Sequence, residues 1–253
     1  MGENIKVFQS KESMIHSLAE AIVDLARRKA EATGRFTVAL SGGSTPKPLY
    51  ESFASSQYLH KIPWDKVFFF FGDERCVPHD SEDSNYHMVH EAILSKVPVP
   101  AENIFPTEMQ DVNPEASAEL YEKTIKKFFA LGENQLPRFD LMLLGLGPDG
   151  HTASLFPGTK ALEERQRLVV SNYVEKMSTH RITLTLPVIN NSENIIFVVA
   201  GHDKAPVIAH ILGEKTADQH LYPAQLVKAT DGSLKWYLDR EAYQECQSHA
   251  CQH

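Results

Sequence analysis

An aspartate and a histidine separated by one glycine, Asp149 and His151, form the most reactive pattern in the sequence. A histidine has an ordinary pKa of about 6.5 and exchanges protons near neutral pH, so His151 is the candidate general base or acid. Asp149 is placed to orient the imidazole and to favour its protonated form. The alternative interpretation is a turn histidine that bonds only to the backbone.

This pair follows a strand that the sequence predicts to be buried. The run from Leu141 to Leu144 is unbroken and apolar, which is typical of a strand covered on both faces of a parallel sheet. Gly145, Gly147 and Gly150 then permit a tight turn. Because ligands bind just beyond the carboxyl ends of such strands, we expect the chemistry to take place here.

The same glycines also match the spacing of a dinucleotide-binding fingerprint, Gly-x-Gly-x-x-Gly. A dinucleotide site needs a long helix directly after the glycines, whereas Pro157 and Gly158 end any helix shortly after it begins. Asp149 would also place a carboxylate against the pyrophosphate. We therefore expect no nucleotide cofactor.

A second glycine-rich turn follows a short predicted strand and reads Ser-Gly-Gly-Ser-Thr-Pro from residue 41. Gly42 and Gly43 permit close approach to the backbone, Ser44 and Thr45 offer hydroxyls and a helix N-cap, and Pro46 suits the first helical position. A strand, a glycine turn and a helix start together present free N–H groups and the positive end of the helix dipole, which favours binding of an anion. The alternative is an ordinary capped turn. A nucleotide P-loop is excluded because the Gly-Lys-Ser/Thr ending is absent.

Cationic residues accompany several other predicted strands. Asp73 and Arg75 follow the apolar strand 67–71, and Arg75 is suited to phosphate because its planar fork donates two parallel hydrogen bonds. Lys204 lies between a strand end and a helix start, and Arg181 begins an alternating strand. Each of these charged side chains either lies on the solvated rim of the sheet or forms part of a site. In a doubly wound sheet the strand ends converge, so a single pocket is expected.

The elements that must position these residues alternate between strands and helices, which predicts an α/β domain with a parallel or mostly parallel sheet covered on both sides. The periodicity predicts an amphipathic helix over 11–32 that packs on the sheet. Other helices are expected at 85–95, 115–131 and 205–212, and strands at 36–40, 67–71, 141–144, 168–170, 181–186, 195–200 and 234–238. We expect one domain, 1–253, with a loose tail over 247–253.

Composition limits the partners. The chain has 253 residues and a net charge of −8, which argues against nucleic acid or an anionic membrane as partner. Three scattered cysteines, Cys76, Cys246 and Cys251, fit a reducing compartment, and with no apolar leader or membrane span we expect a cytoplasmic protein. No metal site is expected, and the absence of a helical heptad seam favours a monomer.

Five motifs in register resemble the 6-phosphogluconolactonase family, over about residues 7–237. They are Ser41-Gly42-Gly43-Ser44-Thr45-Pro46, Gly72-Asp73-Glu74-Arg75, the segment 145–158 that contains Asp149-Gly150-His151, Arg181-Ile182-Thr183-Leu184-Thr185, and Gly201-His202-Asp203-Lys204. The resemblance implies a Rossmann-like sheet flanked by helices on both faces, without nucleotide or metal in the catalytic step. It also implies hydrolysis of 6-phospho-D-glucono-1,5-lactone to 6-phosphogluconate, a step of the oxidative pentose phosphate pathway.

By the same resemblance, His151 is implied as general base on water and Asp149 as the residue that holds the imidazole. The phosphate and hydroxyls of the substrate fall to the following residues: Gly42, Gly43, Ser44, Thr45, Arg75, Arg181 and Lys204. Asp73 either meets substrate or orients Arg75. Which basic residue touches phosphate, and which steadies oxyanion charge, stays open at this point.

Two other functions compete. The first is the deaminating isomerase of the same group, glucosamine-6-phosphate deaminase, which carries a further acidic residue soon after its Asp-Gly-His triplet. Residues 152–156 here contain no acidic residue, which favours the lactonase. The second is a non-catalytic phosphosugar sensor, which the presence of both Asp149 and His151 disfavours.

Overall fold

The main sheet has six strands, all parallel, in the order β1-β9-β8-β5-β2-β3. The computed structural model describes residues 4–109, 113–213 and 222–250, with backbone alone for 247–250. The strands are β1 (Asn4–Phe8), β2 (Phe36–Leu40), β3 (Val67–Phe71), β5 (Leu141–Leu144), β8 (Asn194–Val199) and β9 (Ser233–Asp239). The expected α/β fold with a mostly parallel sheet is confirmed.

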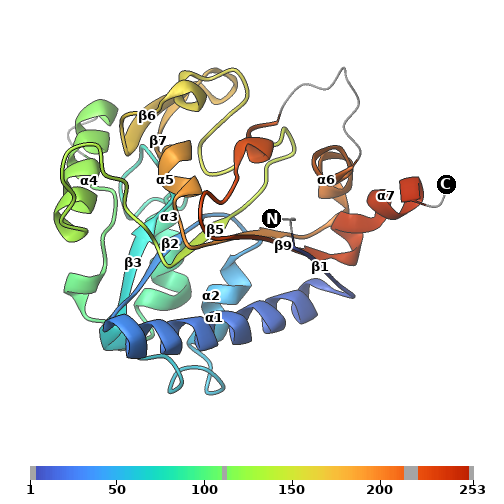
Figure 1. Ribbon diagram of the computed structural model, residues 1–253, viewed down its shortest axis with the longest axis horizontal. Helices are drawn as coiled ribbons and strands as arrows, with labels where there is room; N and C mark the ends of the chain where they lie inside the picture. The colour runs from blue at the N-terminus through green and yellow to red at the C-terminus, as the bar shows by residue number, and fades with distance from the viewer. Residues whose placement is uncertain (1–3, 110–112, 214–221, 251–253) are drawn as a thin grey trace.

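Helices cover both faces of this sheet, as Figure 1 shows. One face packs against α1 (Lys11–Thr33), α2 (Lys47–Phe53) and α3 (Asn85–Val89), which continues as a π-helical turn, His90–Leu94. The other packs against α4 (Pro114–Phe128), α5 (Leu186–Asn190), α6 (Ala205–Leu212) and α7 (Arg240–Ala250). Alternate residues of each central strand enter the two cores, which explains why these strands are mostly apolar.

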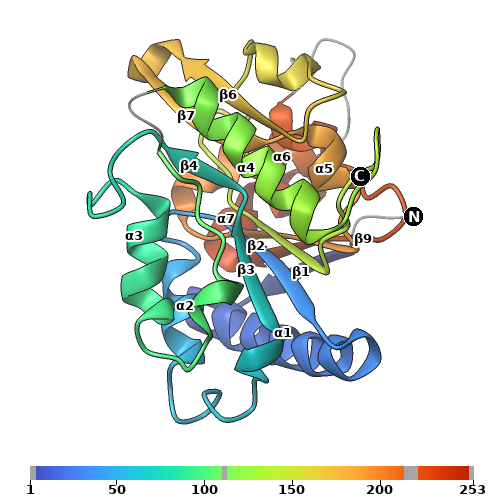
Figure 2. The same cartoon turned by 90° about the vertical axis from the view of Figure 1, so that its left-hand side faces the viewer.

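A second, three-stranded antiparallel sheet lies beside the main one (Figure 2) and was not expected from the sequence. It consists of β4 (Asp73–Arg75), β7 (Thr179–Leu184) and β6 (Val169–Val174), in the order β4-β7-β6. Gly72 joins the two sheets: its N–H donates to the Leu40 carbonyl at 2.8 Å, and its carbonyl accepts from the Leu184 N–H at 2.9 Å. The charged residues after β3 therefore form a strand of their own.

Several local expectations need correction. The edge strand β1 was missed because Lys6 interrupts it and its Ile5 and Val7 are exposed, so it has no apolar run. Neither Ser44 nor Thr45 caps α2: Pro46 occupies the N-cap, and no side-chain cap bond is present.

The ends of some elements also differ from expectation. The strands expected at 168–170 and 181–186 are β6 and β7. Helix α7 reaches Ala250 and so includes the start of the tail that was expected to be loose, while 251–253 lie outside the described residues. Within the described residues, no helix is long and apolar enough to cross a membrane.

The carboxylate of Glu74 is fully buried and joins β4 to the start of α3. It accepts backbone N–H groups from Arg75, Asn85 and Tyr86, each at 2.7 Å, and the Ser84 hydroxyl at 3.1 Å. Burial raises its pKa, because removal from water opposes the charge, although these donors act in the opposite direction. Glu74 is therefore a structural residue, whereas its neighbours on β4 face the other way.

We predict that Glu74→Ala lowers the free energy of unfolding by about 3 kcal/mol, because three buried N–H groups lose their acceptor at about 1 kcal/mol each. Urea denaturation followed by circular dichroism measures the change. The control Glu119→Ala removes an exposed carboxylate of α4 and should change stability little. Equal stability of the two variants would contradict the role given to Glu74.

Candidate active site

A pocket of about 610 Å³ opens at the carboxyl ends of the main strands. The turns after β2, β5 and β8 line it, and β4 and β7 of the small sheet add residues from the side. Nine of the ten predicted site residues line this pocket: Gly42, Gly43, Ser44, Thr45, Asp73, Arg75, His151, Arg181 and Lys204. The tenth, Asp149, lies outside the lining, behind the histidine ring.

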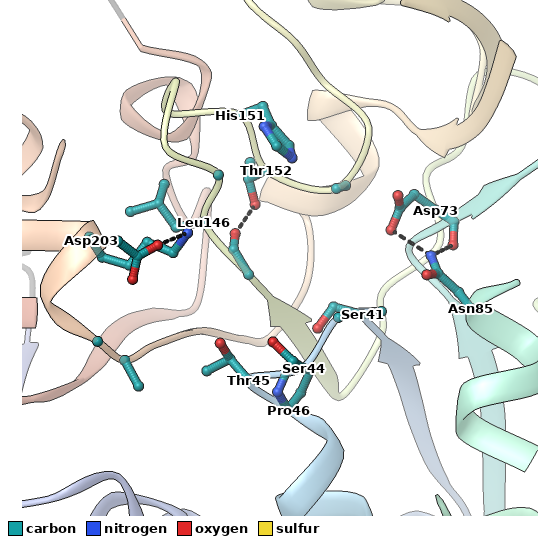
Figure 3. Close-up of a pocket in the computed structure, with 18 of the residues that line it drawn as sticks. Ser41, Ser44, Thr45, Pro46, Asp73, Asn85, Leu146, His151, Thr152 and Asp203 are labelled. Carbon is teal, nitrogen blue, oxygen red and sulfur yellow. Dashed lines mark hydrogen bonds and ion pairs between the residues drawn. The ribbon is translucent and has the colours of Figure 1, made fainter. Parts of the chain in front are cut away.

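The pocket has two distinguishable sides (Figure 3). Asp203 and the turn carrying Ser44 and Thr45 lie on one side, and Asp73 with Asn85 on the other. His151 lies between them, on the loop above the glycine turn. The convergence expected from the strand ends is therefore observed in space.

The turn after β2 bonds to Tyr50 on its inner side and lines the pocket on its other side. The Tyr50 hydroxyl donates to the Ser41 carbonyl at 2.8 Å and accepts its N–H at 3.2 Å. A β-carbon on Gly42 would lie 1.8 Å from the Asn85 amide oxygen, and Gly43 has a φ of +98° in open space, so glycine is required at both positions. Lys11 at the start of α1 donates to the Ser44 carbonyl at 3.3 Å.

The loop after β5 fixes the imidazole at close range. The Gly147 N–H donates to the His151 carbonyl at 2.9 Å, and a β-carbon on Gly147 would lie 2.0 Å from the ring. Phe156 stacks on the imidazole, with ring centroids 4.0 Å apart and planes at 24°. The loop glycine and this phenylalanine therefore hold the ring in one orientation.

Asp149 and His151 form a 2.5 Å hydrogen bond between Oδ1 and Nδ1. The second carboxylate oxygen of Asp149 pairs with the ammonium of Lys176, which lies over the Phe156 ring, 4.8 Å from its centroid. Burial opposes the charge of Asp149, but the bonds from Lys176 and His151 outweigh it and lower its pKa to about 2. An ionised Asp149 accepts the Nδ1 proton, which leaves Nε2 as the basic nitrogen.

Burial lowers the pKa of His151, although Asp149 favours the protonated ring, as expected. Burial is the largest cause and disfavours the imidazolium. Asp149 and Asp73 raise the pKa, and the ammonium of Lys176 lowers it again, so the net shift is downward. Near neutral pH the ring is therefore a neutral base rather than an acid.

Two arginines lie side by side on neighbouring strands of the small sheet. Arg75 of β4 and Arg181 of β7 are register partners, and within the described residues neither forms an ion pair. Burial, and then the like charge of Arg75, lower the pKa of Arg181, and both side chains line the pocket. Two unpaired guanidinium groups side by side are suited to an anionic or oxygen-rich ligand.

The carboxylate of Asp73 is held by neutral groups. It accepts the Ser154 hydroxyl at 2.6 Å and the Asn85 amide at 3.4 Å, whereas Arg75 donates to the Asp83 carbonyl at 2.5 Å. The structure thus gives Asp73 no role in orienting Arg75 and leaves its carboxylate facing the pocket. On the other side, Lys204 pairs with the exposed Asp203 at 2.9 Å.

Four residues of the site were not singled out from the sequence: Lys11, Asn85, Phe156 and Lys176. Phe156 lies in the segment 145–158, five residues after His151, so its nearness to the ring could have been inferred. Lys176 comes from the tip of the β6–β7 hairpin, and nothing in its local sequence marks it. Among the described residues, no group of His, Cys, Asp or Glu side chains is arranged to hold a metal ion, and His79 bonds to the Thr107 carbonyl instead.

Known proteins are similar to this chain in both sequence and fold. The family model of glucosamine-6-phosphate isomerases/6-phosphogluconolactonase matches residues 9–236. The 6-phosphogluconolactonase of a Nostoc species is 42% identical, with 96% of this chain and 98% of the relative covered. That of a Synechocystis species is 39% identical over the same shares.

Solved structures of this family have a similar fold. The 6-phosphogluconolactonase of Trypanosoma brucei superposes with a TM-score of 0.84 at 29% identity, covering 96% of this chain and 98% of its own. A monomeric glucosamine-6-phosphate deaminase, at 19% identity and a TM-score of 0.78, shares the fold alone. With a matching family model and relatives near 40% identity over almost their whole length, the chain belongs to the family of glucosamine-6-phosphate isomerases and 6-phosphogluconolactonases.

Proposed function

We propose that this protein hydrolyses 6-phospho-D-glucono-1,5-lactone to 6-phospho-D-gluconate, as the names of its closely matching relatives suggest. The observation that carries the proposal is the imidazole of His151, bonded to Asp149, in a pocket that a glycine turn, Arg75, Arg181 and Lys204 line. A deaminase would need a further acidic group after the Asp-Gly-His triplet, and residues 152–156 contain none.

In the proposed reaction, Nε2 of His151 takes a proton from water as the water oxygen attacks the lactone carbonyl. Asp149 accepts the Nδ1–H and stabilises the imidazolium that forms. As the tetrahedral intermediate collapses, the bond between the carbonyl carbon and the ring oxygen breaks. The imidazolium then returns its proton to that oxygen, which becomes the C5 hydroxyl of the open acid. The histidine ends the cycle neutral, so no cofactor is required.

The phosphate is assigned to the side formed by the turn at 42–45 and Lys204. Gly42 and Gly43 expose backbone there, and Lys11 brings a second ammonium to the Ser44 carbonyl. The opposite side, with Arg75, Arg181 and the carboxylate of Asp73, is assigned to the sugar hydroxyls and the lactone carbonyl. His151 lies between the two sides, where the reacting carbonyl would be placed.

The protein is further proposed to act as a monomer in the cytoplasm. The sequence shows no helical heptad seam of the kind that joins subunits, which favours a monomer. Cys76 and Cys246 are free thiols, as expected in a reducing compartment. Sedimentation equilibrium would test the oligomeric state, and a tagged chain imaged in its native cell would test the location.

We predict that His151→Ala reduces turnover of freshly made lactone by about 100-fold or more, the usual contribution of a general base. Turnover is measured as acid release above the spontaneous rate. The control His60→Ala removes an exposed histidine outside the pocket and should retain full activity. Full turnover by the His151 variant would remove this residue from its role.

The pH dependence follows from the lowered pKa of His151. The active form is the neutral ring, so kcat/KM should be constant near neutrality and fall as the pH drops through that pKa. Half of the plateau value is expected at a pH below about 6.5, the ordinary value for histidine. A profile with its acid midpoint above that value would show that burial does not control this group.

We predict that Lys176→Met moves the acid midpoint of that profile upward, by about half a pH unit for a partly exposed ion pair. The reason is that the ammonium both lowers the pKa of His151 and holds Asp149. Lys176→Arg should restore the profile, and Lys160→Met, an exposed control, should not change it. An unshifted midpoint in the methionine variant would show that Lys176 does not act through Asp149.

The assignment of the phosphate predicts that Lys204→Met lowers kcat/KM about tenfold or more for the phosphorylated lactone, the loss of a charge-assisted hydrogen bond. Hydrolysis of unphosphorylated glucono-1,5-lactone should change little. Lys228→Met, outside the pocket, serves as the control. Equal losses on both substrates would place the phosphate elsewhere.

A further inference from the structure

A second hollow, of about 420 Å³, lies between α1 and the edge of the main sheet. Four cations line it, Lys6 of β1, Arg27 and Arg28 of α1, and Lys235 of β9, and they are called the basic groove here. Lys235 lies near the amino end of its strand, whereas the active site occupies the carboxyl ends. The two hollows share no residue.

The strand pairing places two of the cations side by side on the floor of the groove. Lys6 pairs with Tyr237 and Asn4 pairs with Lys235, so Lys6 and Lys235 are diagonal neighbours on the face that α1 covers. The Lys6 ammonium donates to the Tyr237 hydroxyl at 3.2 Å and lies 5.1 Å from the centre of its ring. The floor therefore presents fixed cations.

These charges are not compensated within the described residues. None of the four cations takes part in an ion pair there, and the lining carboxylates, Asp24 and Glu31, are exposed at the rim. Arg28 uses its Nε only for the carbonyl of Asp24, in its own helix. Burial, and then the charges of Lys6 and Arg28, lower the pKa of Lys235. A half-buried cation without a counter-ion is unfavourable, and a bound anion would relieve it.

We propose that the basic groove binds a small phosphorylated polyanion, at a site separate from the active site. Arginine donates in a fork that matches phosphate oxygens, and lysine supplies point charge to the same groups. Four cations against two exposed carboxylates suit a ligand with two or more negative charges. The volume is sufficient for a pyrophosphate group with a further substituent. Such a site is notable in a chain whose net charge is −8.

The probe for this site is inorganic pyrophosphate, titrated at constant ionic strength against ¹⁵N-labelled protein. The backbone amides of Lys6, Lys235 and Tyr237 should shift with a saturable curve, which distinguishes this site from any binding at the glycine turn. The double variant Lys235→Met with Arg28→Gln should bind about tenfold more weakly at these amides, the loss expected for one charge-assisted contact. Lactone hydrolysis should be unchanged, because neither residue lines the active site.

A second measurement, of thermal stability, tests the proposal even if the double substitution changes the packing around the groove. Pyrophosphate should raise the melting temperature of the wild type more than that of the double variant, because binding at this groove stabilises only the protein with an intact groove, whereas binding at the glycine turn would stabilise both equally. The control Lys123→Met with Lys127→Gln removes two exposed cations of α4 and should respond as the wild type does. Equal ligand-induced shifts in the wild type and the double variant, or no saturable change at the three amides, would overturn the proposal.

Discussion

The carboxylate of Glu74 is the interaction on which the site depends. By accepting the N–H groups of Asn85 and Tyr86, it fixes the start of α3 against β4. The Asn85 side chain then bonds to Asp73 and fills the space beside Gly42. One buried group thus sets the relative positions of the small sheet, the glycine turn and α3. Because Glu74 points into the protein, its strand neighbours Asp73 and Arg75 point into the pocket.

Much of the fold could be predicted from the apolar pattern, because the central strands are buried on both faces and therefore consist mostly of apolar residues. The edge strand β1 escaped notice for the opposite reason: one of its faces is exposed and Lys6 lies within it. The small sheet was equally hard to anticipate, since β4 is only three residues long and pairs with a strand more than a hundred positions later. Such pairing depends on long-range packing, which a local pattern does not report.

The site also contains residues that could be predicted from the sequence and residues that could not. The glycine turn and the Asp-Gly-His loop carry their geometry in their own residues, so their place in the pocket could be predicted. Lys176 reaches Asp149 from a hairpin tip, and Lys11 reaches the turn from a helix start, so only the folded chain reveals them. The direction of the net pKa shift of His151 could not be predicted either. A neighbouring carboxylate is visible in the sequence, whereas the burial that outweighs it is not.

The pairing of β1 with β9 has a consequence for how the protein is made. Among the described strands, the first strand of the sheet pairs with the last alone, so it cannot pair until residues 233–239 have been synthesised. Until then the backbone of β1 and the unpaired edge of β8 remain open to other strands. Nascent chains of this protein therefore pass through a stage at which chaperones have an extended apolar edge to bind, and the sheet closes only near the end of synthesis.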